Sequence, residues 1–157
     1  MTARVHAVAF RNRNGQQLVG MVHEPTGVPS TVGVVLLSPG VKNRVAPHRL
    51  YNRLAAALCA RGHWVLRFDF NGLGDSEGRV DEQLLRELYA TVAVGRYVAD
   101  TRDALDWMAE TFGCQRFVTG GLCGGALTGL LEAQDDRRVV GIVGIGMPMM
   151  LDSPNVD

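Results

Sequence analysis

The chain has 157 residues, a length that fits one domain and allows roughly 68–70% of the unfolded surface to be buried. Its 16 basic and 16 acidic side chains balance, which argues against the charged surfaces typical of nucleic-acid and membrane binding. No apolar run is long enough to span a membrane, and residues 1–10 lack a signal-peptide pattern. We therefore expect a single domain, residues 1–157, with no nucleic-acid partner and no membrane span.

The cysteines are Cys59, Cys114 and Cys123, an odd number with wide spacing. This pattern fits neither a disulfide framework nor a zinc site, and a reducing cytoplasm is the simplest interpretation. Lys42 is the only lysine beside many arginines, which hints at a GC-rich, bacterial genome. Cys59 in an apolar helix and Cys114 just before a strand are expected to be structural.

The first half of the chain predicts strands separated by turns and one helix. Asn14-Gly15 is a hairpin turn signal between two strands, and the apolar run that follows suits a strand buried on both faces. Pro47 opens a helix whose leucines recur every four residues until Gly62. The expected strands are residues 5–10, 18–23, 31–37 and 63–68.

The second half predicts further helices and strands in alternation. Short and longer helical patterns cover residues 81–89 and 100–112, followed by a strand at 116–120, a helix at 126–133 and a strand at 139–146. Residues 147–157 read as a polar tail. Strands that alternate with helices imply right-handed crossovers, so we expect an α/β fold with a mostly parallel sheet after the antiparallel hairpin.

The segment Gly121-Leu122-Cys123-Gly124-Gly125 lies between an expected strand and an expected helix. It matches the nucleophile elbow G-x-S-x-G with cysteine in the serine position. Small residues are needed around such a turn because side chains would collide with the neighbouring strand and helix. The start of the helix favours negative charge, so a cysteine here gains thiolate character.

This glycine-rich segment has two other interpretations. A dinucleotide site would require the spacing G-x-G-x-x-G and an acidic residue after a following strand, and both are absent. Cys123 could also be a small buried residue in an elbow that has lost its function. The strand–turn–helix context favours the nucleophile, with the N–H of Gly124 as one donor to an oxyanion.

The order of these features resembles the α/β-hydrolase superfamily. An antiparallel hairpin comes first, then the Pro39-Gly40 loop, then Asn71-Gly72-Leu73-Gly74-Asp75-Ser76, and then the elbow. The third of these is similar to a loop of the serine-aminopeptidase-like branch. The elbow is similar to that of exosortase-associated hydrolases, and dienelactone hydrolases also use cysteine there. The resemblance covers about residues 5–146 and implies a three-layer α/β-hydrolase core that lacks the last strands and the final helix.

The resemblance also implies roles for particular residues. The N–H of Val41 would be the second oxyanion donor, and Gly40, Leu122 and Met147 would contact the substrate. A thioester on Cys123 would be the intermediate in cleaving an acyl ester, thioester or amide, with acyl transfer as an alternative. Asp75 and Ser76 would stabilise a turn. No metal and no cofactor is implied.

The chain departs from the family pattern in its histidines. The family order is nucleophile, acid, histidine, yet His6, His23, His48 and His63 all precede Cys123. Asp152 is a candidate acid, although most members place the acid one strand later. We therefore expect a second segment or polypeptide to supply the Asp and His and to dock on the apolar strand edge at residues 139–146. A non-catalytic subunit or binding module on the same scaffold is the alternative.

Overall fold

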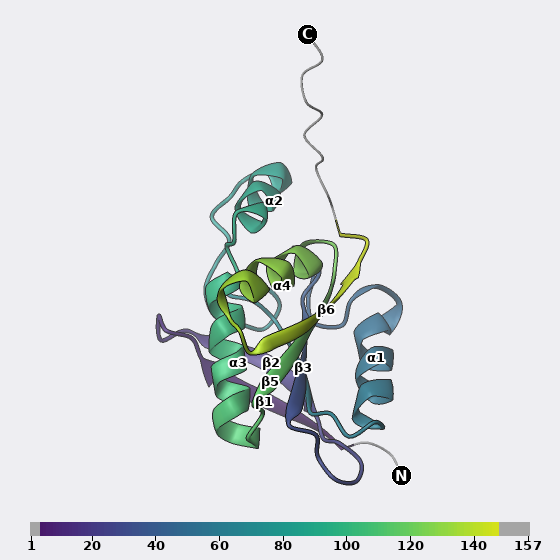
Figure 1. The fold of residues 1–157 in the computed structure, drawn as a ribbon. Helices are drawn as coiled ribbons and strands as arrows, with labels where there is room; N and C mark the ends of the chain where they lie inside the picture. The colour runs from purple at the N-terminus through teal and green to yellow at the C-terminus, as the bar shows by residue number, and fades with distance from the viewer. Residues whose placement is uncertain (1–3, 148–157) are drawn as a thin grey trace.

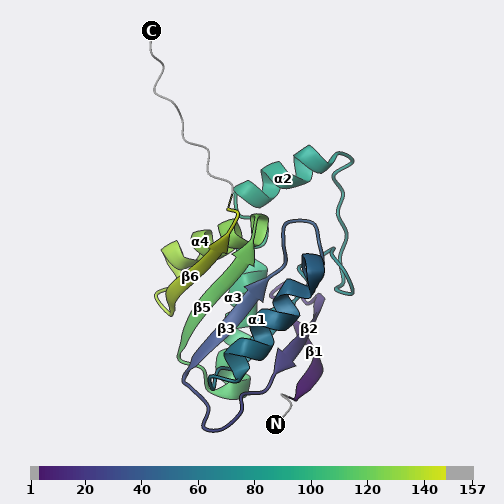
Figure 2. The same cartoon turned by 90° about the vertical axis from the view of Figure 1, so that its right-hand side faces the viewer.

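The structure is a computed structural model and describes residues 4–147. Its strands form one sheet of order β1-β2-β4-β3-β5-β6. β1 pairs antiparallel with β2 and β2 antiparallel with β4, while β4, β3, β5 and β6 run parallel. This confirms the expected N-terminal hairpin and mostly parallel sheet (Figures 1 and 2). The strands are β1 Val5–Arg11, β2 Gln17–His23, β3 Val32–Leu37, β4 Val65–Phe68, β5 Arg116–Leu122 and β6 Val139–Ile145.

Helices cover both faces of the sheet. α1 (Leu50–Cys59) packs on one face, and α3 (Val98–Phe112) and α4 (Gly124–Asp135) pack on the other (Figure 1). One apolar cluster fills each interface, the larger beneath α3 and the smaller beneath α1. The expected three-layer α/β-hydrolase arrangement is thereby confirmed. The short helix α2 (Leu85–Ala93) contacts α4 and stands out from the layers (Figure 2).

The helix that begins at Pro47 is broken near its start. Pro47–Arg49 forms a 3₁₀ turn, and the α-helical part starts only at Leu50. His48 and Arg49 have φ angles of 54° and 55°, left-handed values that a continuous right-handed helix cannot contain.

The expected helix over residues 81–89 is shifted by about one turn. The structure places α2 at Leu85–Ala93 and leaves Leu84 extended. The carboxylate of Glu82, before the helix, pairs with the guanidinium of Arg96, which follows it. The leucine spacing fits either position, but burial of Leu88 and Val92 selects the later one. α3, by contrast, begins earlier than expected, at Val98.

The strand β6 forms one edge of the sheet and leaves apolar side chains in contact with solvent. Val140 and Val143 are 53% and 51% exposed, and Ile142 is 39% exposed. Within residues 4–147 no further strand pairs with β6. A long apolar edge of this kind is a template for pairing with another segment. Among the helices of that same part of the chain, none is long and apolar enough to cross a membrane.

Candidate active site

Cys123 occupies the tight turn between β5 and α4. Its φ and ψ are 54° and −119°, a conformation that L-residues rarely adopt and that costs about 1–3 kcal/mol. The Cys123 N–H donates to the Ile145 carbonyl at 2.9 Å, which ties the turn to the end of β6. The cysteine is half-buried. Strand, strained turn and helix therefore occur where the sequence motif predicts a nucleophile elbow.

The glycines around Cys123 are required by close backbone contacts. A Cβ atom on Gly121 would lie 2.3 Å from the Gly125 carbonyl carbon. A Cβ on Gly125 would lie 2.4 Å from the Leu37 carbonyl oxygen. These atoms belong to the main chain and cannot rotate away, so the start of α4 can rest on β3 and β5 only with glycine at both positions.

The loop after β3 touches the first residue of α4. A Cβ on Gly124 would lie 2.9 Å from the Cα of Gly40, whose own φ is 56°. Val41 follows directly, so the structure brings both expected donor residues to one place. Neither the Gly124 N–H nor the Val41 N–H donates a hydrogen bond to an acceptor within residues 4–147. Both amides are thus available to a negatively charged oxygen.

The side chains of α2 lie against these two residues. The ring of Tyr89 comes within 2.9 Å of the position that a Cβ on Gly40 would take, and a methyl of Val92 comes within 3.1 Å of that on Gly124. An open hollow of about 490 Å³ is lined by Val41, Lys42 and Gly74, among others. The sequence pattern did not indicate that α2 packs against Gly40 and Gly124, because its leucines indicated only a short helix.

The remaining predicted substrate residues lie beside the elbow. Leu122 is half-buried directly before Cys123, and its N–H donates to the Tyr51 hydroxyl at 2.8 Å. Met147 follows the end of β6, near the position of a Cβ on Gly144. Asp152, the candidate acid, lies outside the described residues.

The four histidines lie at positions that do not involve Cys123. His6 contacts Glu24 at the exposed start of β1, and His48 is exposed in the 3₁₀ turn. His63 contacts the carbonyl of Val32, the first residue of β3, whereas the elbow lies at the opposite end of the strands. Within residues 4–147, no histidine is hydrogen-bonded to Cys123.

His23 is buried, and its Nε2 accepts a hydrogen bond from the Arg67 Nε at 2.9 Å. The proton of the neutral ring therefore sits on Nδ1. Burial, together with the Arg67 charge, lowers the pKa of His23 to about 4. This histidine is a neutral core residue at ordinary pH.

The acidic loop after β4 supports the backbone near the site. Asp69 is fully buried, accepts the Arg44 N–H at 2.7 Å and pairs with the Arg44 guanidinium. Its carboxylate also accepts the Asp75 N–H, and its carbonyl accepts the Ser76 hydroxyl. These bonds hold the loop beyond Val41 in place. Asp75 and Ser76 thus stabilise a turn, as expected, and Asp69 connects that turn to Arg44.

The arrangement of the sheet, the strand–turn–helix at Cys123 and the loop after β3 is that of an α/β-hydrolase. Residues 29–156 match the family described as serine aminopeptidase, S33. The chain belongs to this family. No curated protein gives a significant match to the sequence.

Solved structures show the same fold at low sequence identity. The chain is similar to the esterase Pf2001 of Pyrococcus furiosus, with a TM-score of 0.77, 22% identity and coverage of 96% of this chain and 54% of that one. It is also similar to the α/β hydrolase GrgF from Penicillium sp. sh18 (TM-score 0.70, 22% identity, 92% of this chain and 46% of that one). A third is the hypothetical protein PA2218 of Pseudomonas aeruginosa (TM-score 0.73, 21% identity, 94% and 44%). The chain thus spans about half the length of these proteins.

Proposed function

We propose that this chain carries the nucleophile and the oxyanion donors of an acyl hydrolase, with Cys123 as the attacking group. The observation that carries the proposal is the strained turn at Cys123 in contact with the Gly40 backbone. In this proposal the contact sets the thiol beside the N–H groups of Gly124 and Val41, neither of which has an acceptor within residues 4–147. A nucleophile next to free amide donors is the arrangement that acyl transfer needs.

The reaction proceeds in two steps. The Cys123 thiolate attacks the carbonyl carbon of an ester, thioester or amide, and the carbonyl electron pair moves onto the oxygen, which the Gly124 and Val41 N–H groups hold. The tetrahedral intermediate collapses to a thioester, and the leaving group departs with a proton from a histidine. Water then gives a proton back to that histidine, attacks the thioester and releases the carboxylic acid and the thiol. An alcohol or amine in place of water would give acyl transfer.

The histidine and its acid belong, in this proposal, to a segment outside the described residues or to a second polypeptide, with Asp152 as a candidate for the acid. Gly40, Leu122 and Met147 would face the acyl group. The comparison with the Pyrococcus furiosus esterase supports an ester substrate, since that protein is named for this activity. The thiol nucleophile and the acyl substrate are our inference from the elbow.

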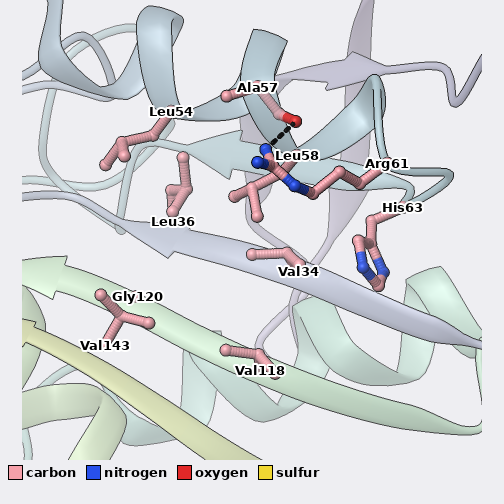
Figure 3. A pocket seen from close by; sticks show the side chains of 10 residues that line it. All are labelled: Val34, Leu36, Leu54, Ala57, Leu58, Arg61, His63, Val118, Gly120 and Val143. Atoms are coloured by element: carbon pink, nitrogen blue, oxygen red, sulfur yellow. Dashed lines mark hydrogen bonds between the residues drawn. The ribbon is translucent and has the colours of Figure 1, made fainter.

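The complementing segment has an apolar place to bind. Beside the edge strand β6, a groove of about 300 Å³ lies between α1 and the sheet, as Figure 3 shows. Leu54 and Leu58 face Val118 and Val143 across it, and the Arg61 side chain donates to the Ala57 carbonyl at its rim. We infer that the partner adds a strand to β6 and places apolar side chains in this groove.

A non-catalytic subunit is the second candidate. It is favoured by the histidines, since none within residues 4–147 contacts Cys123. An acyloxymethyl ketone probe, which alkylates activated thiols, separates the two candidates. The enzyme predicts fast labelling of native Cys123 that disappears in Cys123→Ser and in denaturant. Labelling no faster than that of a free thiol would leave the non-catalytic subunit.

The other two cysteines are internal controls for this experiment. Burial raises the pKa of the Cys114 thiol to about 11 and also raises the pKa of Cys59. Both thiols are therefore protonated at pH 8 and react slowly. Peptide mapping of the labelled chain should find the probe on Cys123 alone.

The partner is tested by denaturing intact-mass spectrometry of the protein purified from its natural source. We expect a second polypeptide, or a longer chain, that contains an Asp and a His after the nucleophile. A single species at the mass of these 157 residues would contradict the complementing segment.

A further inference from the structure

A buried tyrosine links the two strands that carry the site. Tyr51 of α1 has no exposed surface. Its hydroxyl donates to the Leu37 carbonyl at 2.6 Å and accepts from the Leu122 N–H at 2.8 Å. Leu37 is the last residue of β3, directly before the loop with Gly40, and Leu122 is the last residue of β5, directly before Cys123.

The tyrosine acts where the strand pairing stops. β3 and β5 pair in register as far as Leu37 opposite Gly121. Beyond this pair the chains separate, one into the oxyanion loop and the other into the elbow. The Tyr51 hydroxyl connects the two chains at that point. It takes the place of the next backbone hydrogen bond between the two strands. The same Leu37 carbonyl lies against Gly125 at the start of α4.

The direction of the two hydrogen bonds follows from their partners. A peptide N–H can only donate and a carbonyl can only accept, so the hydroxyl proton points to Leu37. Burial raises the pKa of Tyr51 to about 12; the Leu122 N–H opposes this rise and negative charge at Cys123 adds to it. The phenol is therefore protonated, as the bond to Leu37 requires.

We propose that Tyr51 is a positioning residue that fixes the distance between the Cys123 sulfur and the oxyanion donors. This inference rests on the proposed function and deepens it. Acyl transfer needs the sulfur and the two N–H groups around one carbonyl, where displacements of tenths of an ångström matter. Alkylation of a thiol needs no oxyanion donors. Loss of the hydroxyl should therefore slow acylation of Cys123 much more than its alkylation.

The test compares two Tyr→Phe variants of the full chain. Tyr51→Phe removes both hydrogen bonds. Tyr97→Phe is the matched control, because Tyr97 is also buried and its hydroxyl has no hydrogen-bond partner within residues 4–147. Its ring stacks on that of Phe70, with the ring centroids 4.3 Å apart. For each variant, the rate of acylation by p-nitrophenyl acetate and the rate of alkylation by iodoacetamide are measured at Cys123 between pH 6 and pH 9.

The ratio of the two rates decides the outcome. We expect Tyr51→Phe to lower the ratio about 10-fold or more across the pH range, and Tyr97→Phe to leave it unchanged. An unchanged ratio in Tyr51→Phe would overturn the positioning role. If the wild type acylates no faster than a free thiol, the proposed function itself fails, so the two failures are distinct.

A second variant keeps the test open if Tyr51→Phe does not fold. Tyr51→4-aminophenylalanine restores a donor to Leu37 but offers a weaker acceptor to the Leu122 N–H. We expect its acylation-to-alkylation ratio to fall below that of the wild type while its alkylation rate stays the same. A wild-type ratio in this folded variant would overturn the proposal as well.

Discussion

At the scale of single residues, the site depends on backbone contacts that the motif pattern anticipates and on side chains that it does not. The glycines of the elbow follow from the sequence, because a sharp strand-to-helix turn leaves no space for side chains. Tyr51 does not, since its position beside the leucine stripe of α1 indicates only a core aromatic. The Arg44–Asp69 pair was also missed, because it joins residues 25 positions apart.

Gly125→Ala tests the close contact beneath the elbow. The new Cβ would lie 2.4 Å from the Leu37 oxygen, which belongs to the main chain. We expect a loss of about 1–3 kcal/mol or more in the free energy of unfolding, measured by urea denaturation. Gly144→Ala is the matched control, since its Cβ would meet Ala126 at an ordinary 3.6 Å. Equal stability of the two variants would contradict the packing described above.

His23 predicts how stability depends on pH. The folded protein holds the pKa of this histidine near 4, whereas the unfolded chain has the ordinary value of 6.5. Below pH 6.5 this histidine is protonated in the unfolded state but stays neutral in the folded state. The free energy of unfolding therefore falls as the pH drops towards 4. The loss amounts to about 3 kcal/mol at most.

Urea unfolding at pH 7 and pH 4.5 measures this effect. We expect His23→Gln to remove most of the difference between the two pH values, although the variant is less stable overall. His6→Gln, at an exposed position of β1, should leave the difference as it is. A wild-type pH dependence in His23→Gln would show that other groups cause the loss.

At the scale of elements, the order and type of helices and strands could be predicted, but several boundaries could not. A continuous apolar run identifies β3, which is buried on both faces, and apolar periodicity identifies α3 because its core-facing positions repeat regularly. It placed α2 too early, since the leucine spacing fits both positions and only the burial of Leu88 and Val92 selects the later one. The left-handed residues His48 and Arg49 broke a helix that Pro47 and the leucines indicated as continuous.

The edge strand β6 carries its own prediction. Val143 is half-exposed and lines the groove beside α1, so an isolated chain should associate through this surface. We expect Val143→Lys to reduce that association, measured by light scattering over a range of concentrations. Val28→Lys is the matched control, because Val28 is 91% exposed in a loop. A wild-type chain that stays monomeric at all concentrations would contradict the docking surface.

At the scale of the whole molecule, the chain has the fold of an α/β-hydrolase, and we propose that it provides one half of the catalytic site. The sheet order, the strand–turn–helix at Cys123 and the position of the Pro39-Gly40 loop beside it follow from contacts within residues 4–147 and were foreseeable from motif order. A base for Cys123 is found neither by the sequence pattern nor among those residues, and the solved relatives are about twice as long. The proposed split of the triad accounts for both the absence of a base beside Cys123 within residues 4–147 and the exposed apolar edge at β6.

The most direct test of Cys123 as an acyl nucleophile is a burst measurement with p-nitrophenyl acetate. We expect release of one equivalent of p-nitrophenolate per chain, faster than with a free thiol at the same pH. Intact mass should show one acetyl group on Cys123, removable by hydroxylamine as expected of a thioester. Acetylation that is no faster than that of the denatured chain, or that is unchanged in Cys123→Ser, would contradict the proposed nucleophile.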